Sequence, residues 1–308
     1  MIFDCKVLSL KEITEFAKNN NIPYSTDEPM SKHTTFKIGG KAKLMLFVEN
    51  EEQVASAVKE CKKYNQRYIA VGNGSNLLVS DDGIDAVVIE MGKGFSDVRL
   101  IDDETVYAEA GAQLMKACRF ALEHGLSGLE FAYGIPGSCG GAAFMNAGAY
   151  GGEMKDVLYR CDHIDKNGDR GFLEGDDLKL SYRRSAYYDN GCIVTGLYMR
   201  LKKDKPEDIK ARMDDFLSRR KAKQPLEYPS AGSTFKRPDG YFAGALIEEC
   251  NLKGASVGGA QVSTKHAGFV INTGGATCKD VLDLCKKVSD TVKAQKGVEL
   301  EMEIRVTE

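Results

Sequence analysis

The side chains best suited to chemistry lie in four short segments of the second half of the chain. One of them, SYRRS at 181–185, places two guanidinium groups beside a tyrosine. Arginine can bind a carboxylate or a phosphate through two parallel hydrogen bonds. The segment therefore indicates an anion site at Arg183 and Arg184, with a pair of solvated surface arginines as the alternative.

A second segment, AGSTFK at 231–236, places the Ser233 hydroxyl in a glycine turn close to Lys236. It differs from the nucleophile elbow of the α/β-hydrolases, because Gly232 directly precedes Ser233 and position 235 is not a glycine. None of the four histidines lies near it in the sequence, so nothing supports a Ser–His nucleophile pair. A functional hydroxyl competes here with a serine that only caps a turn.

Two further segments bring charges next to apolar stretches. In STKHAGFVIN at 263–272, the basic pair faces an anionic ligand or forms a solvated turn. Residues 299–306 alternate between apolar and charged types, which predicts a strand with Leu300, Met302, Ile304 and Val306 inward. The opposite face carries Glu301, Glu303 and Arg305 and is either functional or an ordinary polar strand face.

Glycine is the unusual residue of the composition, with 32 in 308 residues, about 10% against an average near 7%. Gly72 and Gly74 follow a predicted strand, in a turn whose consecutive backbone N–H groups would suit a pyrophosphate. The third glycine of a dinucleotide fingerprint is replaced by Leu77, so a plain strand-exit turn stays open. Neither Gly-Lys pair, at 40–41 and 92–93, precedes Ser or Thr, which weighs against a P-loop.

The densest glycine region is 134–152, where seven glycines lie in 19 residues among mostly small side chains. Such a segment can build little core, yet it is too apolar for a flexible linker. We interpret it as a loop packed against a flat, extended ligand. A tight structural crossing is the alternative.

The overall composition excludes several classes of protein. A net charge of −3 gives no case for a nucleic-acid or membrane partner. Nine scattered cysteines without a CxxC pair argue against a disulfide framework and a zinc ribbon. The first residues lack the apolar core of a signal peptide, and no run of about 18 apolar residues occurs. We expect a cytoplasmic and monomeric protein. We also expect no metal, since His33, His124 and His163 show no metal spacing.

Local patterns predict alternating helices and strands that position these segments. An α/β part has helices at 9–20, with Ser9 and Glu12 spaced as a capping box, and from Asn50. Its strands are expected at 44–48, 68–71 and 85–90. A β-rich part has strands at 105–110, 157–165 and 192–201, and a helix at 113–124 closed by Gly125. A charged helix at 206–223 leads to an α+β part with helices at 243–250 and 279–295 and strands at 268–272 and 299–306.

The ordered set of motifs resembles the UDP-N-acetylenolpyruvoylglucosamine reductases, a family of flavoenzymes. The matching segments are HTTFKIGG, VGNGSNLL, the glycine-rich stretch within 125–154, SYRRS, PSAGSTFK, VSTKHAGFVIN and LEMEIR. The family implies an α+β protein with an FAD-binding domain of the vanillyl-alcohol-oxidase type, made of two α/β subdomains at 1–92 and 93–204. A C-terminal α+β substrate-binding domain follows at 205–308. The short chain is similar to the subtype that lacks an extra tyrosine loop.

The resemblance also implies roles for individual residues. Arg183, Ser233 and Glu303 would be catalytic, although Glu301 lies two residues from Glu303 on the same strand face. The sugar nucleotide would be bound by Tyr182, Lys236, Arg237 and Lys265, with Arg237 at a position where many relatives have Asn. FAD would be held by Gly72, Asn73, Gly74, Ser75, Asn76, Leu77, Gly134, Ile135, Pro136, Gly137, Ser138, Gly140, Gly141, Asn146, Ala147 and Gly148.

The family reaction would use NADPH as the hydride donor and FAD as the carrier to reduce the enolpyruvyl group of UDP-N-acetylglucosamine enolpyruvate. The product would be UDP-N-acetylmuramate, a peptidoglycan precursor. Arg183 would stabilise charge that develops on the substrate carboxylate, and protonated Glu303 could donate a second hydrogen bond. Ser233 would protonate the α carbon. The alternatives are an FAD-dependent oxidase of the same superfamily, acting on an alcohol or sugar, and a non-catalytic nucleotide-sugar-binding module.

Overall fold

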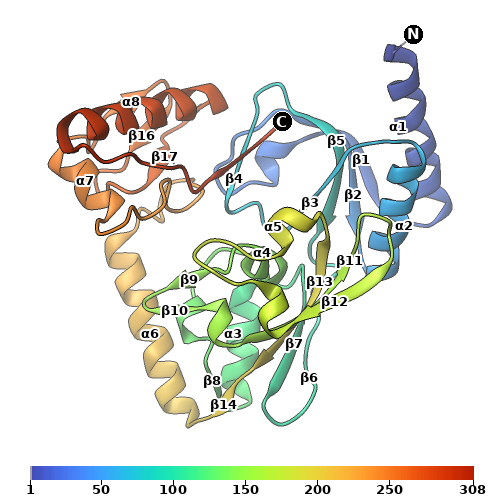
Figure 1. Ribbon diagram of the computed structural model, residues 1–308, viewed down its shortest axis with the longest axis horizontal. Helices are drawn as coiled ribbons and strands as arrows, with labels where there is room; N and C mark the ends of the chain where they lie inside the picture. The colour runs from blue at the N-terminus through green and yellow to red at the C-terminus, as the bar shows by residue number, and fades with distance from the viewer. Residues whose placement is uncertain (1) are drawn as a thin grey trace. The chain divides into compact units, whose positions relative to one another are not determined.

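The computed structural model describes residues 2–308, with side chains from Leu10 onward (Figure 1). The chain forms two compact units. Unit 1 contains the residues up to 26, 44–73 and 86–218, and unit 2 contains 27–43, 74–85 and 219–308. Two early segments therefore belong to the same unit as the C-terminal part of the chain.

Unit 1 begins with helices α1 (Ile2–Asn19) and α2 (Glu51–Lys63) and a sheet in the order β1-β2-β5-β3. Its strands are β1 (Tyr24–Pro29), β2 (Lys41–Val48), β5 (Ile84–Met91) and β3 (Tyr68–Val71), and β3 pairs with β5 in parallel. The Asn50 side chain caps α2 by accepting a hydrogen bond from the Gln53 N–H at 2.9 Å. The predicted inward face of α2, with Val54, Ala57, Val58 and Cys61, is buried.

The capping box predicted at Ser9 is wrong, because α1 begins at Ile2 and Ser9 lies inside the helix. No glycine or proline stands in the preceding residues to end the helix. Serine is only mildly unfavourable in a helix interior, so the helix continues through it.

The second layer of unit 1 is an antiparallel five-stranded sheet that supports the glycine-rich segment. Its order is β12 (Arg170–Glu174), β11 (Leu158–Ile164), β13 (Ile193–Arg200), β7 (Thr105–Glu109) and β6 (Val98–Leu100). Helices α3 (Leu114–Glu123) and α4 (Cys139–Phe144) contact β7, and α4 also contacts β13. Gly125 follows α3 in the left-handed conformation, at φ 63°, as predicted.

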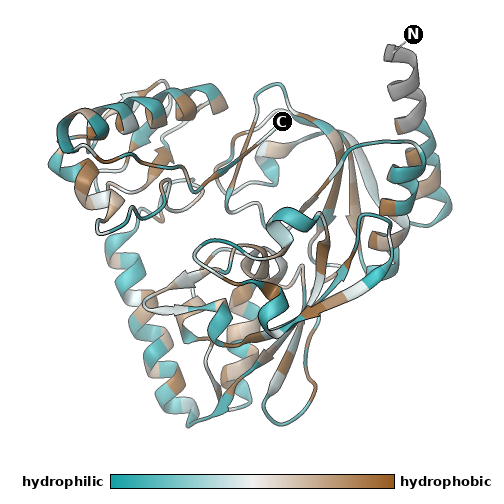
Figure 2. Ribbon diagram, viewed as in Figure 1, coloured by the Kyte–Doolittle hydropathy of each residue, from teal (hydrophilic) through white to brown (hydrophobic). Residues whose placement is uncertain are grey.

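Short elements complete this part of unit 1. The strand pairs are β8 (Leu126–Ser127) with β14 (Lys202–Lys203), and β9 (Gly148–Ala149) with β10 (Gly152–Glu153). The 3₁₀ turns are η2 (Glu130–Ala132), η3 (Met154–Asp156) and η4 (Gly175–Leu178), and α5 spans Tyr187–Asn190. The predicted charged helix is α6 (Pro206–Lys223), which is mainly hydrophilic in Figure 2.

Unit 2 contains η1 (Met30–Lys32), helices α7 (Ala243–Glu249) and α8 (Cys278–Lys296), and a small antiparallel sheet. The sheet has the order β15 (Ser256–Val257), β16 (Ala260–Val262) and β17 (Val270–Asn272). The ribbon of α8 alternates between hydrophobic and hydrophilic colours in Figure 2. Its buried residues recur every three or four positions, so one face joins a core with Phe36, Ile38 and Leu78.

The predicted strand at 299–306 is wrong for most of its length. Only β18 (Arg305–Thr307) is a strand, and it pairs in parallel with β4 (Leu77–Val79). Leu300 and Ile304 are buried as predicted, whereas Val306 is 44% exposed. A two-stranded pair has few neighbours to cover its side chains, so the alternating pattern does not bury Val306. Within residues 2–308, no helix is both long and apolar enough to cross a membrane.

Candidate functional site

The turn after β3 presents a row of backbone donors. Gly74 has a φ of 58°, and a Cβ there would meet the His33 carbonyl oxygen at 2.0 Å, so only glycine fits. The backbone N–H groups of Asn73, Gly74 and Ser75 form no hydrogen bond with any described residue. Consecutive N–H groups in such a turn make an anion-binding concavity.

The glycine-rich segment combines close packing with further backbone donors. A Cβ at Gly140 would lie 2.7 Å from the Ala110 Cβ, and one at Gly152 would lie 2.8 Å from the Phe131 ring. The structural-crossing alternative therefore explains these two glycines. In contrast, the backbone N–H groups of Gly137 and Ser138 have no hydrogen-bond partner among the described residues.

Within unit 1, Gly72 and Asn73 lie against the second glycine segment. The Asn73 side-chain amide donates to the Pro136 carbonyl oxygen. The Ser138 hydroxyl lies against Gly72, where a Cβ would come within 2.1 Å of it. The unbonded N–H groups of Asn73, Gly137 and Ser138 thus belong to two adjoining stretches of backbone in unit 1, and those of Gly74 and Ser75 follow Asn73 along the chain. This donor set fits the diphosphate of a dinucleotide such as FAD.

The other predicted FAD-binding residues have varied surroundings. Ile135 and Ala147 are partly buried against the core of unit 1, and Gly141 is exposed. Cys139 is fully buried, and burial raises the pKa of its thiol to about 12, so it acts as a small apolar residue. Leu77 begins β4 and pairs with Arg305.

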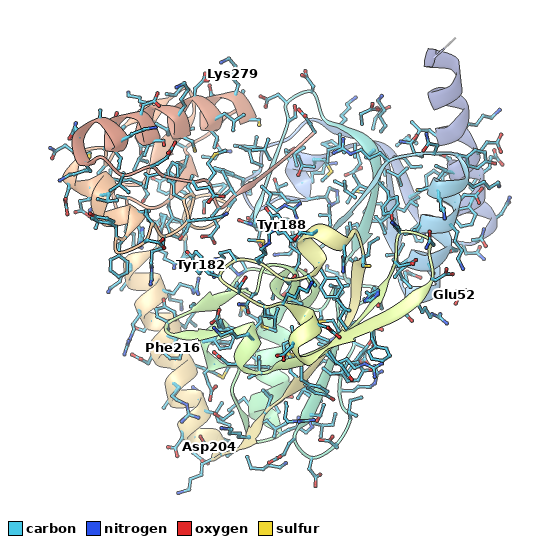
Figure 3. The ribbon with its side chains drawn as sticks, viewed as in Figure 1. Glu52, Tyr182, Tyr188, Asp204, Phe216 and Lys279 are labelled. Carbon is cyan, nitrogen blue, oxygen red and sulfur yellow. The ribbon has the colours of Figure 1, made fainter. Side chains whose placement is uncertain are left out.

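Arg183 lies at the tip of a strained turn. The backbone of Ser181 and Arg184 exchanges two hydrogen bonds of 3.0 and 3.1 Å, and Arg183 between them has a φ of 55°. The left-handed conformation costs a non-glycine residue on the order of 1–3 kcal/mol and persists only where the surroundings hold it. The Arg183 guanidinium lies 5.0 Å from the Tyr182 ring and 3.5 Å from the Gly148 carbonyl oxygen. The predicted anion site therefore lies against the glycine-rich segment. Figure 3 labels Tyr182, the residue before Arg183.

Arg184 differs from its neighbour although the two are adjacent in the sequence. Its guanidinium donates to both carboxylate oxygens of Asp189, at 2.9 and 2.8 Å. Its side chain is 56% exposed. The surface-arginine alternative therefore describes Arg184, and Arg183 remains as the candidate.

In unit 2, Ser233 follows Gly232, whose φ is 79°. The Ser233 hydroxyl forms no hydrogen bond with any of residues 10–308. The next residue, Thr234, is buried and takes three hydrogen bonds of 2.8 Å: its N–H donates to Gly268 O, its hydroxyl accepts from Val270 N, and its carbonyl accepts from Glu303 N. The sequence predictions did not include Thr234. Its position directly after Ser233 in AGSTFK is the feature of the sequence that could have indicated it.

The two glutamates of the last segment have different environments. Glu301 has a side chain that is 73% exposed and forms an ion pair with Lys236. Glu303 is partly buried, and its carbonyl accepts from the Asn76 amide at 3.2 Å. Asn76 also accepts from Arg305 N at 2.9 Å through its own carbonyl, so this predicted FAD-binding residue holds the 303–305 segment in place.

The remaining predicted substrate cations have protein partners. Lys265 donates to the Lys221 carbonyl at 2.9 Å and lies 3.5 Å from the Glu227 carboxylate. The Arg237 guanidinium lies 4.6 Å from the ring centre of Phe242, which is 63% exposed. Asn146 is fully buried and its amide is bonded within the protein.

Comparisons with known proteins identify both parts of the chain. A family model described as an FAD binding domain matches residues 42–170, and one described as the C-terminal domain of UDP-N-acetylenolpyruvoylglucosamine reductase matches 224–307. The reductase of that name from Syntrophomonas wolfei is 48% identical over 295 residues, covering 96% of this chain and 98% of the relative. Its counterpart from Clostridium perfringens is 49% identical over 298 residues, covering 96% of both.

Solved structures agree with these matches. The crystal structure of UDP-N-acetylenolpyruvylglucosamine reductase from Thermus caldophilus has a TM-score of 0.78 and 35% identity, covering 93% of this chain and 99% of that one. A glucooligosaccharide oxidase from Acremonium strictum has a TM-score of 0.51 at 11% identity, covering 94% of this chain and 60% of that one, which shows a shared fold alone. The predicted fold class is confirmed. The chain belongs to the UDP-N-acetylenolpyruvoylglucosamine reductase family.

Proposed function

We propose that this protein is an FAD-containing, NADPH-dependent oxidoreductase that converts UDP-N-acetylglucosamine enolpyruvate to UDP-N-acetylmuramate. One observation carries the proposal: the strained Arg183 turn lies against a glycine-rich segment that also contacts Gly72 and Asn73, and unbonded backbone donors lie on both sides of that contact. An anion-stabilising cation thus adjoins a dinucleotide cradle. The names and high identity of the relatives support the same assignment.

The FAD diphosphate would be held by the backbone N–H groups of Asn73, Gly137 and Ser138 in unit 1, and by those of Gly74 and Ser75, which follow Asn73 along the chain. The other residues of the proposed FAD site are Gly72, Asn76, Leu77, Gly134, Ile135, Pro136, Gly140, Gly141, Ala147 and Gly148. Asn146 is left out of this set, because both N–H groups of its side chain are bonded within the protein. When bound, FAD supplies the hydride-transfer chemistry that no side chain can perform.

Reduction of an enolpyruvyl double bond needs a hydride at the terminal carbon and a proton at the α carbon. Arg183 stabilises the negative charge that the first addition moves onto the substrate carboxylate, because its guanidinium is permanently charged and fork-shaped. Ser233 donates the proton, and its hydroxyl has no protein partner that competes for it. Glu303 is the glutamate of this site, since Glu301 is solvated and paired with Lys236.

Tyr182, Lys236, Arg237 and Lys265 bind the anionic sugar nucleotide. The two lysines exchange their partners Glu301 and Glu227 for substrate oxygens. Such exposed ion pairs contribute little stability, so the exchange costs little. The proposal also includes a monomeric, cytoplasmic enzyme whose functional domains are 1–92, 93–204 and 205–308. Size-exclusion chromatography with light scattering tests the monomer.

The test uses the purified protein under anaerobic conditions in a stopped-flow instrument. We expect a yellow protein whose flavin is bleached by NADPH and reoxidised by the enolpyruvyl sugar nucleotide. Ser233→Ala should leave bleaching by NADPH intact and slow reoxidation by about 10²–10⁴-fold. Unchanged reoxidation in the variant would show that Ser233 is not the proton donor.

Two outcomes would contradict the reductase itself. A reduced enzyme that reacts rapidly with air and ignores the enolpyruvyl compound would be an oxidase of the same superfamily. A colourless protein that neither retains nor takes up FAD would be a binding module.

A further inference from the structure

Two buried side chains hold the Arg183 turn at its two ends. The Asn146 amide donates to the Ser181 carbonyl oxygen at 2.9 Å, before the tip. The Ser185 hydroxyl donates to the Phe144 carbonyl oxygen at 2.8 Å, after the tip. Asn146 has no exposed surface and Ser185 is 2% exposed. Both bonds attach the turn to the same stretch of the glycine-rich segment, at 144–146.

The side-chain amide of Asn146 has no N–H group left to donate to a cofactor. Its nitrogen also donates to the Glu153 carboxylate at 2.7 Å, and its oxygen accepts from Lys155 N at 2.9 Å. A side-chain amide has two N–H donors, and here both are used within the protein. This conflicts with the prediction that Asn146 itself binds FAD.

We propose that Asn146 and Ser185 are positioning residues that act on the reaction through Arg183 and not through the flavin. This inference rests on the role assigned to Arg183 in the proposed function. Arg183 has a left-handed backbone, which persists only where neighbouring contacts fix it. The two bonds fix the residues on either side of Tyr182 and the strained Arg183. They therefore hold the guanidinium in place before negative charge develops on the substrate.

The test compares Asn146→Asp and Ser185→Ala with the wild-type holoenzyme. Asn146→Asp keeps the size of the side chain and the acceptor for Lys155 N, but it loses both donors and places a carboxylate against that of Glu153. We expect unchanged flavin affinity and unchanged bleaching by NADPH, with reoxidation by the enolpyruvyl sugar nucleotide slowed on the order of 10–100-fold. Weaker flavin binding with normal reoxidation of the bound fraction would instead make Asn146 a cofactor ligand and overturn the proposal.

Control substitutions of the same types come from Ser96 and Asn190 of unit 1, whose side-chain hydrogen bonds lie at the surface and away from the Arg183 turn. Ser96 donates to the Lys93 carbonyl at 2.8 Å, and Asn190 accepts from Cys192 N at 2.9 Å. Ser96→Ala and Asn190→Asp should leave both half-reactions at wild-type rates. If they slow reoxidation as much as the test variants do, the effect is general loosening and the proposal fails.

A double-mutant cycle separates positioning from independent chemistry. In an Arg183→Met background, Asn146→Asp should cause no further loss of reoxidation rate, because its effect requires the guanidinium. A further loss of about tenfold or more in that background would contradict an action through Arg183.

Limited trypsin digestion gives a readout that needs neither substrate nor turnover. Trypsin cleaves after arginine, so the rate of cleavage after Arg183 and Arg184, followed by mass spectrometry, reports how often the turn opens. We expect a rise of about tenfold in both test variants, with thermal melts confirming that they are folded. Wild-type protein that is not reoxidised by the enolpyruvyl compound would contradict the proposed function, whereas unchanged digestion would contradict the anchoring alone.

Discussion

The Arg183 turn of unit 1 and the Ser233 turn of unit 2 are held in opposite ways. Arg183 has a strained backbone whose flanking residues are fixed by buried side chains. Ser233 follows a glycine with open space around it, and its hydroxyl is bonded to no described residue. The hydrogen bonds near Ser233 belong to its buried neighbour Thr234.

The difference matches the two chemical tasks proposed for these residues. A charge stabiliser works best when it is aimed before the charge develops, since reorientation during the reaction would cost energy. A proton donor must instead offer its hydroxyl to the substrate, so a strong protein partner would compete with the reaction. Rigid placement therefore suits the task proposed for Arg183, and an unbonded hydroxyl suits the task proposed for Ser233.

The largest expected effect comes from removing the fixed charge. Arg183→Met should lower the rate of reoxidation by the enolpyruvyl substrate by about 10²–10³-fold, equivalent to about 2.7–4 kcal/mol. The matched control is Arg184→Met, which removes a solvated arginine paired with Asp189 and should change the rate by less than about threefold. Anaerobic stopped-flow absorbance measures both, and equal losses would remove the distinction between the two arginines.

The next effect separates Thr234 from Ser233 by stability. Thr234→Val leaves the buried Val270 N–H without its acceptor and should lower the free energy of unfolding by about 1–3 kcal/mol. Ser233→Ala removes a hydroxyl without a protein partner and should change it by less than about 0.5 kcal/mol. Urea unfolding of the two variants measures this. A similar loss in both would mean that Ser233 also supports the fold.

A smaller effect tests the strain in the Arg183 turn. Arg183→Gly relieves a left-handed conformation that costs about 1–2 kcal/mol. It also increases the backbone entropy that the chain loses on folding, which costs about 0.5–1 kcal/mol. The variant should therefore be inactive yet more stable by about 0.5–1 kcal/mol. Tyr182→Gly, in the same turn without a positive φ, should be less stable than wild type. Lower stability of Arg183→Gly in urea unfolding would show that the turn is not strained.

The smallest effect concerns pH. Burial lowers the pKa of His266, whose Nδ1 accepts from the Gly268 N–H at 3.1 Å, next to the carbonyl that Thr234 binds. The unfolded chain then takes up a proton at a higher pH than the folded protein does. Stability should be complete above the ordinary histidine pKa and fall as the pH drops through the folded-state value.

His266→Gln should flatten this dependence in urea-unfolding midpoints measured between about pH 5.5 and 7.5. Burial lowers the pKa of His163 in unit 1 in the same direction, so His163→Gln gives the corresponding measurement there. A wild-type protein that becomes more stable on acidification over this range would contradict both assignments.

Local signals predicted most elements of the fold. The asparagine cap of α2, the glycine after α3 and the proline at the start of α6 all act within a few residues, so they can be read from the chain. The start of α1 was predicted incorrectly because Ser9 does not stop a helix that no glycine or proline ends. The short β18 was missed because its pairing with β4 leaves no local pattern.

The sequence predicted the residue types of the candidate site but few of the contacts between its residues. The sequence indicated an anion site at two adjacent arginines, but only the fold separates Arg183 from Arg184. Asn146 and Thr234 form bonds to residues more than 30 positions away, and such bonds leave no periodic pattern. The catalytic and binding roles themselves stay predictions that the variants above can test.

Unit 2 is built from three separate stretches of the chain, and this limits when it can fold during synthesis. Asn76 bonds to Glu303, 227 positions later, and β4 pairs with β18 at a similar separation. During synthesis, the segments at 27–43 and 74–85 leave the ribosome long before their partners exist. Their apolar residues, such as Phe36 and Leu78, pack in a core with residues between 231 and 304, so this core cannot be complete until those residues have been synthesised. Unit 2 is therefore expected to fold after translation of this region.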